Sequence, residues 1–175
     1  MDTVDRKTRW LAALGSAAFF FVAPGTVAGL VPLLIGKWRF HAPFFGFTAL
    51  RALGILLMAA GLIILIETFL RFALKGLGTP APILPTKHLV VTGSYRFVRN
   101  PMYVAVVSLI LGQALFFGDM HIFIYAMCAW LVTHLFVLTY EEPTLRRTFP
   151  DEYSIFCTHV PRWIPRLTPW NANQD

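Results

Sequence analysis

Four long apolar runs dominate this chain and restrict what it can fold into. They cover residues 10–35, 47–72, 102–117 and 122–140. Each run approaches or exceeds the roughly 17–25 apolar residues that a membrane-spanning helix needs. The third run is short and is expected to borrow residues from its flanks, and Pro24 should kink the first helix.

Acidic residues are almost absent from the central region of the chain. Between Trp10 and Tyr140 only Glu67 and Asp119 occur. The hydrophobic share is 57% and the charged share 14%, against roughly 45–50% and 25% in soluble domains. We therefore predict an all-α integral membrane protein with about four transmembrane helices, in a single domain over residues 1–175.

The basic residues predict which side each end faces. If the N-terminus is cytoplasmic, that side carries Arg6, Lys7, Arg9, Arg71, Lys75, Lys87, Arg96, Arg99, Arg146, Arg147, Arg162 and Arg166. The other side carries Lys37, Arg39 and Arg51. The positive-inside rule then places both termini in the cytoplasm, which in a prokaryote means the cell inner membrane. Topology and anionic lipid explain the net charge of +6, so we expect no nucleic-acid partner.

Two segments between and after the apolar runs hold nearly all the unusual polar residues. They are the loop 76–100 and the tail 141–175, and both face the cytoplasm in this topology. Residues 1–75 supply two helices without a motif, and residues 76–175 carry the motifs. We expect the two segments to meet in one pocket.

The loop ends in a polar, aromatic stretch directly before the third apolar run. From Gly93 to Tyr103 it reads Gly-Ser-Tyr-Arg-Phe-Val-Arg-Asn-Pro-Met-Tyr. Pro101 suits the first turn of a helix, with Asn100 as its N-cap. Lipid-facing arginines and an interfacial aromatic belt could explain each residue singly. Their clustering at a helix N-terminus, which favours anions, points to a binding site.

The tail begins with an adjacent pair of carboxylates. Glu141 and Glu142 follow the fourth apolar run, where burial would be costly without a cationic partner. Arg146 and Arg147, one turn later, could be those partners at helical spacing. The rest of the tail, residues 151–166, is amphipathic and could lie along the membrane interface.

A few polar residues lie inside the apolar runs, and most have structural explanations. Glu67 and Arg71 are spaced i,i+4 and are expected to form an ion pair. His134 is expected to be a packing residue, and Gln113 to bond across helices. No spacing typical of a metal site occurs, so we expect no metal.

Four motifs occur in order along the second half of the chain. They are Gly-x-Gly-Thr-Pro-Ala-Pro (76–82), Leu-Val-Val-Thr-Gly-Ser-Tyr-Arg-Phe-Val-Arg-Asn-Pro-Met-Tyr (89–103), Glu-Glu-x-x-Leu-x-x-x-Phe-x-x-Glu-Tyr (141–153) and Val-Pro-Arg-x-Ile-Pro (160–165). This order resembles the isoprenylcysteine carboxyl methyltransferase and phospholipid methyltransferase superfamily. The resemblance covers about half of the chain and implies an integral-membrane methyltransferase that uses S-adenosylmethionine.

The resemblance also implies which residues form the site. The positions that look like cofactor-binding ones are Gly76, Gly78, Leu89, Val91, Gly93, Tyr95, Arg99, Asn100, Pro101, Tyr103, Glu141 and Glu142. Catalytic roles are implied for Arg99, Asn100 and Glu142, and Arg99 is expected to contact a carboxylate of cofactor or acceptor. Asn100 stands where the family more often has histidine, and an amide cannot titrate near neutrality.

The methyl acceptor is expected to be a lipid or another lipophilic molecule. The first expectation is the carboxylate of an isoprenylcysteine-like molecule, which an arginine could place without a base. The alternative is a phospholipid amine, which must lose a proton to a base such as Glu142. An NADPH-dependent membrane sterol or enone reductase and a non-enzymatic lipid-binding protein also stay open. The Asn-Pro-Met-Tyr motif and the Glu-Glu pair favour methyl transfer over these two alternatives. The sequence does not predict the oligomeric state.

Overall fold

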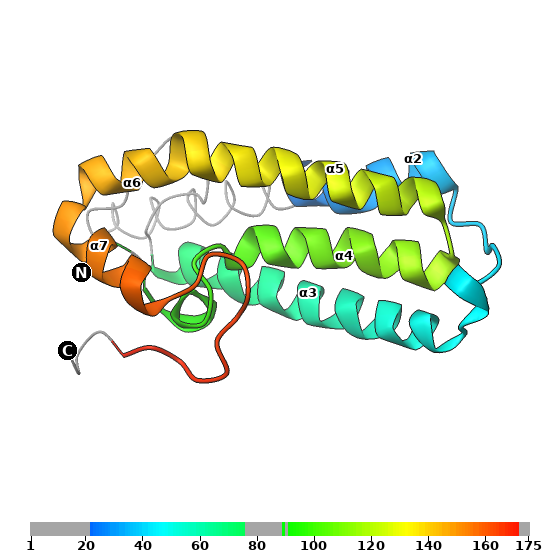
Figure 1. The fold of residues 1–175 in the computed structure, drawn as a ribbon, viewed down its shortest axis with the longest axis horizontal. Coiled ribbons are helices and arrows are strands. Elements are labelled where there is room, and N and C mark those ends of the chain that lie inside the picture. The colour runs from blue at the N-terminus through cyan, green and yellow to red at the C-terminus, as the bar shows by residue number, and fades with distance from the viewer. Residues whose placement is uncertain (1–21, 76–88, 90, 172–175) are drawn as a thin grey trace, which may run out of the picture.

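Helices make up the regular structure of the residues described by the computed structural model, which are 22–75, 89 and 91–171. The elements are η1 (Thr26–Leu30), α2 (Val31–Gly36), η2 (Phe44–Gly46), α3 (Ala49–Lys75), η3 (Gly93–Arg96), α4 (Pro101–Phe117), α5 (Met120–Phe136), η4 (Val137–Glu141), α6 (Glu142–Thr148) and α7 (Pro150–His159). Figure 1 shows α3, α4 and α5 lying lengthwise beside one another. The predicted all-α fold is confirmed.

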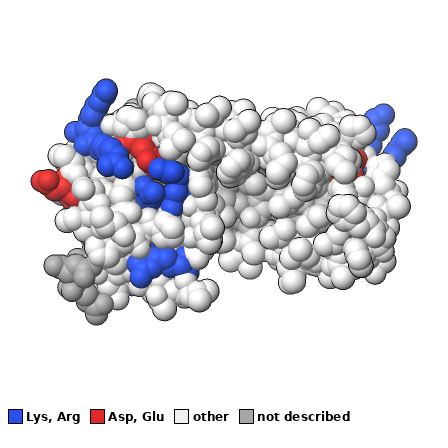
Figure 2. All heavy atoms as spheres, in the orientation of Figure 1, with Lys and Arg blue, Asp and Glu red and all other residues white. Residues whose placement is uncertain are grey.

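Four apolar helical segments match the four runs of the sequence. Residues 49–71 and 120–148 are long and apolar enough to cross a membrane, and 22–36 and 101–117 are shorter apolar segments. Only 17% of each long window is buried within the protein, so most apolar side chains face outward as they would toward lipid. In Figure 2 the charged side chains gather at the two ends and leave an uncharged band between them.

Small residues allow α3 and α4 to pack closely along their length. A Cβ atom added to Gly54 would lie 2.6 Å from the Gly112 carbonyl oxygen, and one added to Gly61 would lie 2.8 Å from the Ala105 carbonyl oxygen. Such contacts are possible only where glycine lets two backbones approach. This pair of helices therefore forms a rigid frame under the polar end of the molecule.

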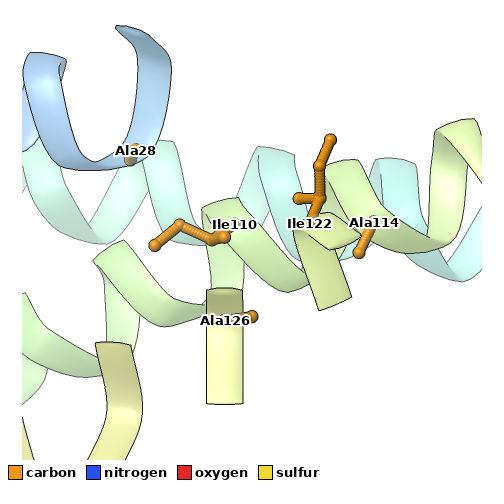
Figure 3. Packing of buried hydrophobic residues seen from close by; sticks show 5 residues of the cluster. All are labelled: Ala28, Ile110, Ala114, Ile122 and Ala126. Carbon is orange, nitrogen blue, oxygen red and sulfur yellow. The ribbon is translucent and has the colours of Figure 1, made fainter. Parts of the chain in front are cut away.

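The buried core lies where α4 and α5 meet the first helical segment. Its central side chains are Ala28, Ile110, Ala114, Ile122 and Ala126 (Figure 3). Gln113 joins the same elements, because its Nε2 donates to the Ala28 carbonyl at 2.6 Å and its Oε1 accepts from Trp38 Nε1 at 3.1 Å. The prediction that Gln113 bonds across helices is confirmed.

A tight turn between α4 and α5 brings the two ends of this pair together. Gly118 adopts φ +71°, which favours glycine, and Asp119 then accepts hydrogen bonds from the main-chain N–H groups of His121 and Ile122 at 2.8 and 3.3 Å. The two helices therefore run antiparallel, and the start of α4 and the end of α5 lie at the same end of the molecule. Pro101 opens α4 as predicted.

Candidate functional site

The start of α4 and the end of η4 meet through a direct hydrogen bond. The Tyr103 hydroxyl donates to Glu141 Oε2 at 2.9 Å across 38 residues of sequence. Both side chains are half-buried. The ion pair between Arg99 and Glu142 also brings the loop and tail segments into contact, as expected, whereas one shared pocket and their roles in binding stay predictions.

Glu142, the neighbouring carboxylate, has a different environment. Its Oε1 accepts from Arg162 Nε at 2.5 Å and its Oε2 from Arg162 NH2 at 3.1 Å, which is a two-point pair. Arg99 NH1 adds an ion pair at 3.3 Å, and Glu142 is only 6% exposed. Arg162 and Arg99 are thus the ion-pair partners in place of the expected Arg146, whose guanidinium lies over the Tyr153 ring, 5.6 Å from its centre, and acts on Glu142 through its charge alone.

The π-helical segment η4 changes the direction in which both carboxylates face relative to α5. Residues 137–141 are wound with hydrogen bonds to the fifth residue, so the segment holds one residue more than a regular helix would. One extra residue turns everything after it by about 100° about the helix axis. The carboxylates therefore face different surroundings from those that a regular helix would give.

Only some of the N–H groups of the Arg99 guanidinium have hydrogen-bond or ion-pair partners among the described residues. Its NH1 contacts Glu142 and also donates to Cys157 Sγ at 2.8 Å. Its Nε is buried and has no hydrogen-bond partner within the described residues of the chain. Buried guanidinium N–H groups are normally paired, so this atom suits an acceptor oxygen that a ligand would bring.

The tail closes over the segment before α4 through main-chain hydrogen bonds. The N–H groups of Arg99, Arg166 and Trp170 donate to the carbonyl oxygens of Pro161, Phe97 and Arg96 at 2.9, 2.9 and 3.0 Å. Arg96 Nε also donates to the Trp170 carbonyl at 2.6 Å. These bonds bring Arg162 to Glu142.

Asn100 caps α4 through its backbone and takes part in the same closure through its side chain. It is the N-cap residue of α4 as predicted, and its carbonyl accepts from the Val104 N–H at 3.1 Å, but its side chain makes no cap hydrogen bond. Its Nδ2 instead donates to the Arg162 carbonyl at 3.1 Å, and the residue is 8% exposed. Asn100 therefore holds the backbone of the arginine that pairs with Glu142.

The apolar side of α7 is covered by the chain itself. Tyr153, Phe156, Val160 and Trp170 form one buried cluster, against which Leu89 and Val91 also pack. These four residues of the tail are buried within the protein, whereas Ile164 and Leu167 are exposed, and a position of the tail along the membrane surface stays a prediction. Burial is the main cause that raises the pKa of the Tyr153 hydroxyl above its ordinary value.

Leu89 and Val91 also border an open cavity of about 630 Å³. Its other lining residues are Thr92, Glu152, Ile155, His159 and Trp170. Among the described residues, Tyr103 and Glu141 are not in this lining. The structure thus places Leu89 and Val91 beside α7, while Gly76 and Gly78 lie outside the described residues.

Tyr95 and Gly93 lie in the turn η3, next to α3. Burial, and after it the charges of Glu141 and Glu67, raise the pKa of the Tyr95 hydroxyl above its ordinary value. Gly93 has φ +60°. The predicted pair of Glu67 and Arg71 is confirmed, but Glu67 also accepts from Ser94 Oγ at 2.6 Å. The sequence did not predict the contact between Glu67 and Ser94. The one signal for it was that the Glu67 carboxylate lies at the same end of the bundle as the loop.

His134 has the packing role that the sequence predicted. Its Nδ1 makes a 3.0 Å hydrogen bond with Trp163 Nε1, and its ring stacks on Trp130 with the centroids 5.2 Å apart. No group of three His, Cys, Asp or Glu residues within the described ranges could hold a metal ion. The chemistry of this end therefore centres on the two carboxylates, the arginines and the tyrosines.

A comparison with models of protein families identifies the family of this chain. Residues 49–152, from α3 into α7, match the model of the phospholipid methyltransferase family. The chain belongs to this family. It is an integral-membrane methyltransferase that uses S-adenosylmethionine and acts on a lipid acceptor. No curated protein matches the chain significantly.

The residues present fit S-adenosylmethionine. The cofactor carries a carboxylate, for which the unpartnered Arg99 Nε is a suitable donor. It also carries an ammonium and a sulfonium cation, and Glu141 has no ion-pair partner among the described residues. One end of the site can therefore receive an anion and the other a cation.

Proposed function

We propose that this protein transfers the methyl group of S-adenosylmethionine to the amine nitrogen of a phospholipid. The observation that carries the proposal is the difference between two adjacent carboxylates. Glu142 is held by Arg162 and Arg99, whereas Glu141 has the Tyr103 hydroxyl as its hydrogen-bond partner. Two carboxylates in such different environments suit two different roles.

Glu141 is the better of the two as a proton acceptor. A lipid ammonium must lose a proton before its nitrogen can attack a methyl group. Glu142, opposite two arginines, is held in its ionised form and is a weak base. Glu141 lacks such cations and lies among tyrosines, so it can take the proton. This replaces the sequence expectation of Glu142 as the base.

The same surroundings favour a cationic acceptor. An ammonium group is attracted by a carboxylate and by the faces of tyrosine rings. Tyr103 contacts Glu141 directly, and the Tyr95 hydroxyl lies within electrostatic reach of it. A carboxylate acceptor brought to Glu141 would be repelled, since both nearby arginines already face Glu142.

The remaining residues hold and align the reactants. When bound, S-adenosylmethionine supplies an electrophilic methyl group. Arg99 would bind its carboxylate, and Glu142 and Asn100 keep Arg99 and Arg162 in place. The closed tail would keep water from the site, so the chain acts mainly by alignment and desolvation.

The orientation in the membrane belongs to the same proposal. Arg99, Arg146, Arg147, Arg162 and Arg166 all lie at the end where α6 and α7 fold, and Figure 2 shows blue side chains gathered there. The positive-inside rule supports a cytoplasmic position for this end. In a prokaryote the protein would lie in the inner membrane, with the site open to the cytoplasmic cofactor pool.

A carboxylate acceptor, such as an isoprenylcysteine-like molecule, is the second candidate. The unpartnered Arg99 Nε is the observation in its favour, because that atom could serve the acceptor instead of the cofactor. Family membership favours methyl transfer over the sterol or enone reductase and over a non-enzymatic lipid-binding protein.

Product chemistry separates the two acceptors. The purified protein in lipid nanodiscs would receive methyl-labelled S-adenosylmethionine with either phosphatidylethanolamine or a prenylcysteine acid. We expect an alkali-stable N-methylated lipid. An alkali-labile product that releases methanol would establish the carboxylate acceptor instead.

Two variants complete this experiment. Glu141→Gln should abolish most amine methylation, while Asp151→Asn, an exposed carboxylate on α7, should retain wild-type rates. Absence of any labelled lipid with the wild-type protein would refute the proposed function.

A further inference from the structure

Glu67, on the motif-free helix α3, is tied to the turn that carries Tyr95. Its Oε2 accepts from Ser94 Oγ at 2.6 Å, and its Oε1 pairs with Arg71 one turn along α3. Glu67 is thus held from both sides, by its own helix and by η3. An exposed i,i+4 pair alone adds little stability, but a carboxylate with two partners has a defined position.

Gly93 allows this contact to form. A Cβ atom at this position would collide with the Arg71 guanidinium and with Glu67 Oε1. The φ of +60° at Gly93 also suits glycine and not other residues. The backbone of the turn therefore rests directly on the Glu67–Arg71 pair.

The turn is clamped on its other side as well. The Ser94 carbonyl accepts from the N–H groups of Phe97 and Val98 at 3.1 and 3.2 Å, and the Phe97 carbonyl accepts from the tail at Arg166. Tyr95 lies between these two attachments, within electrostatic reach of Glu141 and Glu67. Loss of the hydrogen bond between Glu67 and Ser94 would therefore move Tyr95 relative to Glu141.

We propose that Glu67, together with Ser94, is a positioning residue for methyl transfer: it anchors the Gly93–Arg96 turn to α3 and so sets Tyr95 beside Glu141. The inference rests on the proposed function for its kinetic consequence. It assigns α3, which carries none of the recognised motifs, a role in the site. Misplacement of a reacting group by about 1 Å can cost on the order of a hundredfold in rate.

The kinetic test compares Glu67→Ala, Ser94→Ala and the double variant with Asp151→Asn as control. We expect each single variant to lower kcat about tenfold, with the Kd for S-adenosylmethionine and the melting temperature close to wild type. The double variant should lose no more than the single ones, because both remove the same contact. Glu67→Gln keeps an acceptor oxygen for Ser94 and should recover much of the loss, which a merely structural ion pair with Arg71 would not predict.

A spectroscopic readout tests the same inference without activity. The protein labelled with 3-fluorotyrosine gives 19F resonances that Tyr→Phe variants assign. The Tyr95 resonance should shift in Glu67→Ala and Ser94→Ala and return toward wild type in Glu67→Gln, with no change in Asp151→Asn. An unmoved Tyr95 resonance in Glu67→Ala, or a kcat within twofold of wild type, would overturn the proposal. If wild-type protein methylates nothing, the proposed function fails and the 19F result alone decides the positioning role.

Discussion

The two adjacent carboxylates should respond in opposite ways to the same substitution. Glu142→Gln removes the charge opposite Arg99 and Arg162, whose side chains are 11% and 30% exposed. Breaking a buried ion pair costs about 3–5 kcal/mol, and we expect about 3 kcal/mol because Arg162 keeps some water. For a chain of this size, about 2–4 °C of melting temperature are lost per kcal/mol, so the expected drop is roughly 6–12 °C.

Glu141→Gln should leave stability nearly unchanged and remove activity. The amide oxygen still accepts from Tyr103, so the loss should stay below about 1 kcal/mol, or about 4 °C. Loss of a proton acceptor should lower kcat about 10²–10⁴-fold. Both variants would be followed in one detergent by tryptophan fluorescence on heating at one scan rate, and by initial methylation rates. Equal melting temperatures for the two variants, or a Glu141→Gln rate within threefold of wild type, would refute this division of roles.

Three further predictions follow from single contacts. Gly54→Ala and Gly112→Ala should each cost about 1–3 kcal/mol through overpacking, measured as a lower melting temperature, whereas Gly29→Ala, with open space around its Cβ, should cost none. Gly93→Ala should destabilise by about 1–2 kcal/mol and lower kcat; a fully active, equally stable variant would contradict the positive-φ requirement. The raised pKa of Tyr95 means that the folded state holds this proton more tightly than the unfolded state. The stability that this proton contributes is complete below about pH 10 and is lost at higher pH. Tyr95→Phe should therefore flatten the fall of melting temperature above about pH 10. An unchanged slope in this variant would contradict the contribution of Tyr95.

The helical bundle and the position of the site were accessible from the sequence. Apolar runs of membrane-spanning length need no tertiary information, because lipid forces every buried backbone group into a helix. Pro101 marks the start of α4 by its missing N–H, whatever surrounds it. The meeting of Tyr103 with Glu141 followed from topology, since an even number of crossings returns the chain to the same side.

The partners of individual side chains were not accessible in the same way. Arg146 stands at helical spacing from Glu142, yet its guanidinium lies over the Tyr153 ring and acts on Glu142 through its charge alone. Arg162, the actual partner, lies 20 residues away and arrives only because the tail pairs with the segment before α4. Asn100 is the N-cap residue that the local rule predicts, but a tertiary contact draws its side chain away from the cap.

The π-helical turn and the tail together explain how neighbouring residues can hold opposite roles. Glu141 and Glu142 are adjacent on the helix and therefore point about 100° apart. The closed tail brings Arg162 to Glu142, and the segment that it covers supplies Arg99. Glu141 is left facing the tyrosines of η3 and α4. The charge on Glu142 is thus neutralised within the protein, while Glu141 can act on a lipid acceptor that enters from the membrane.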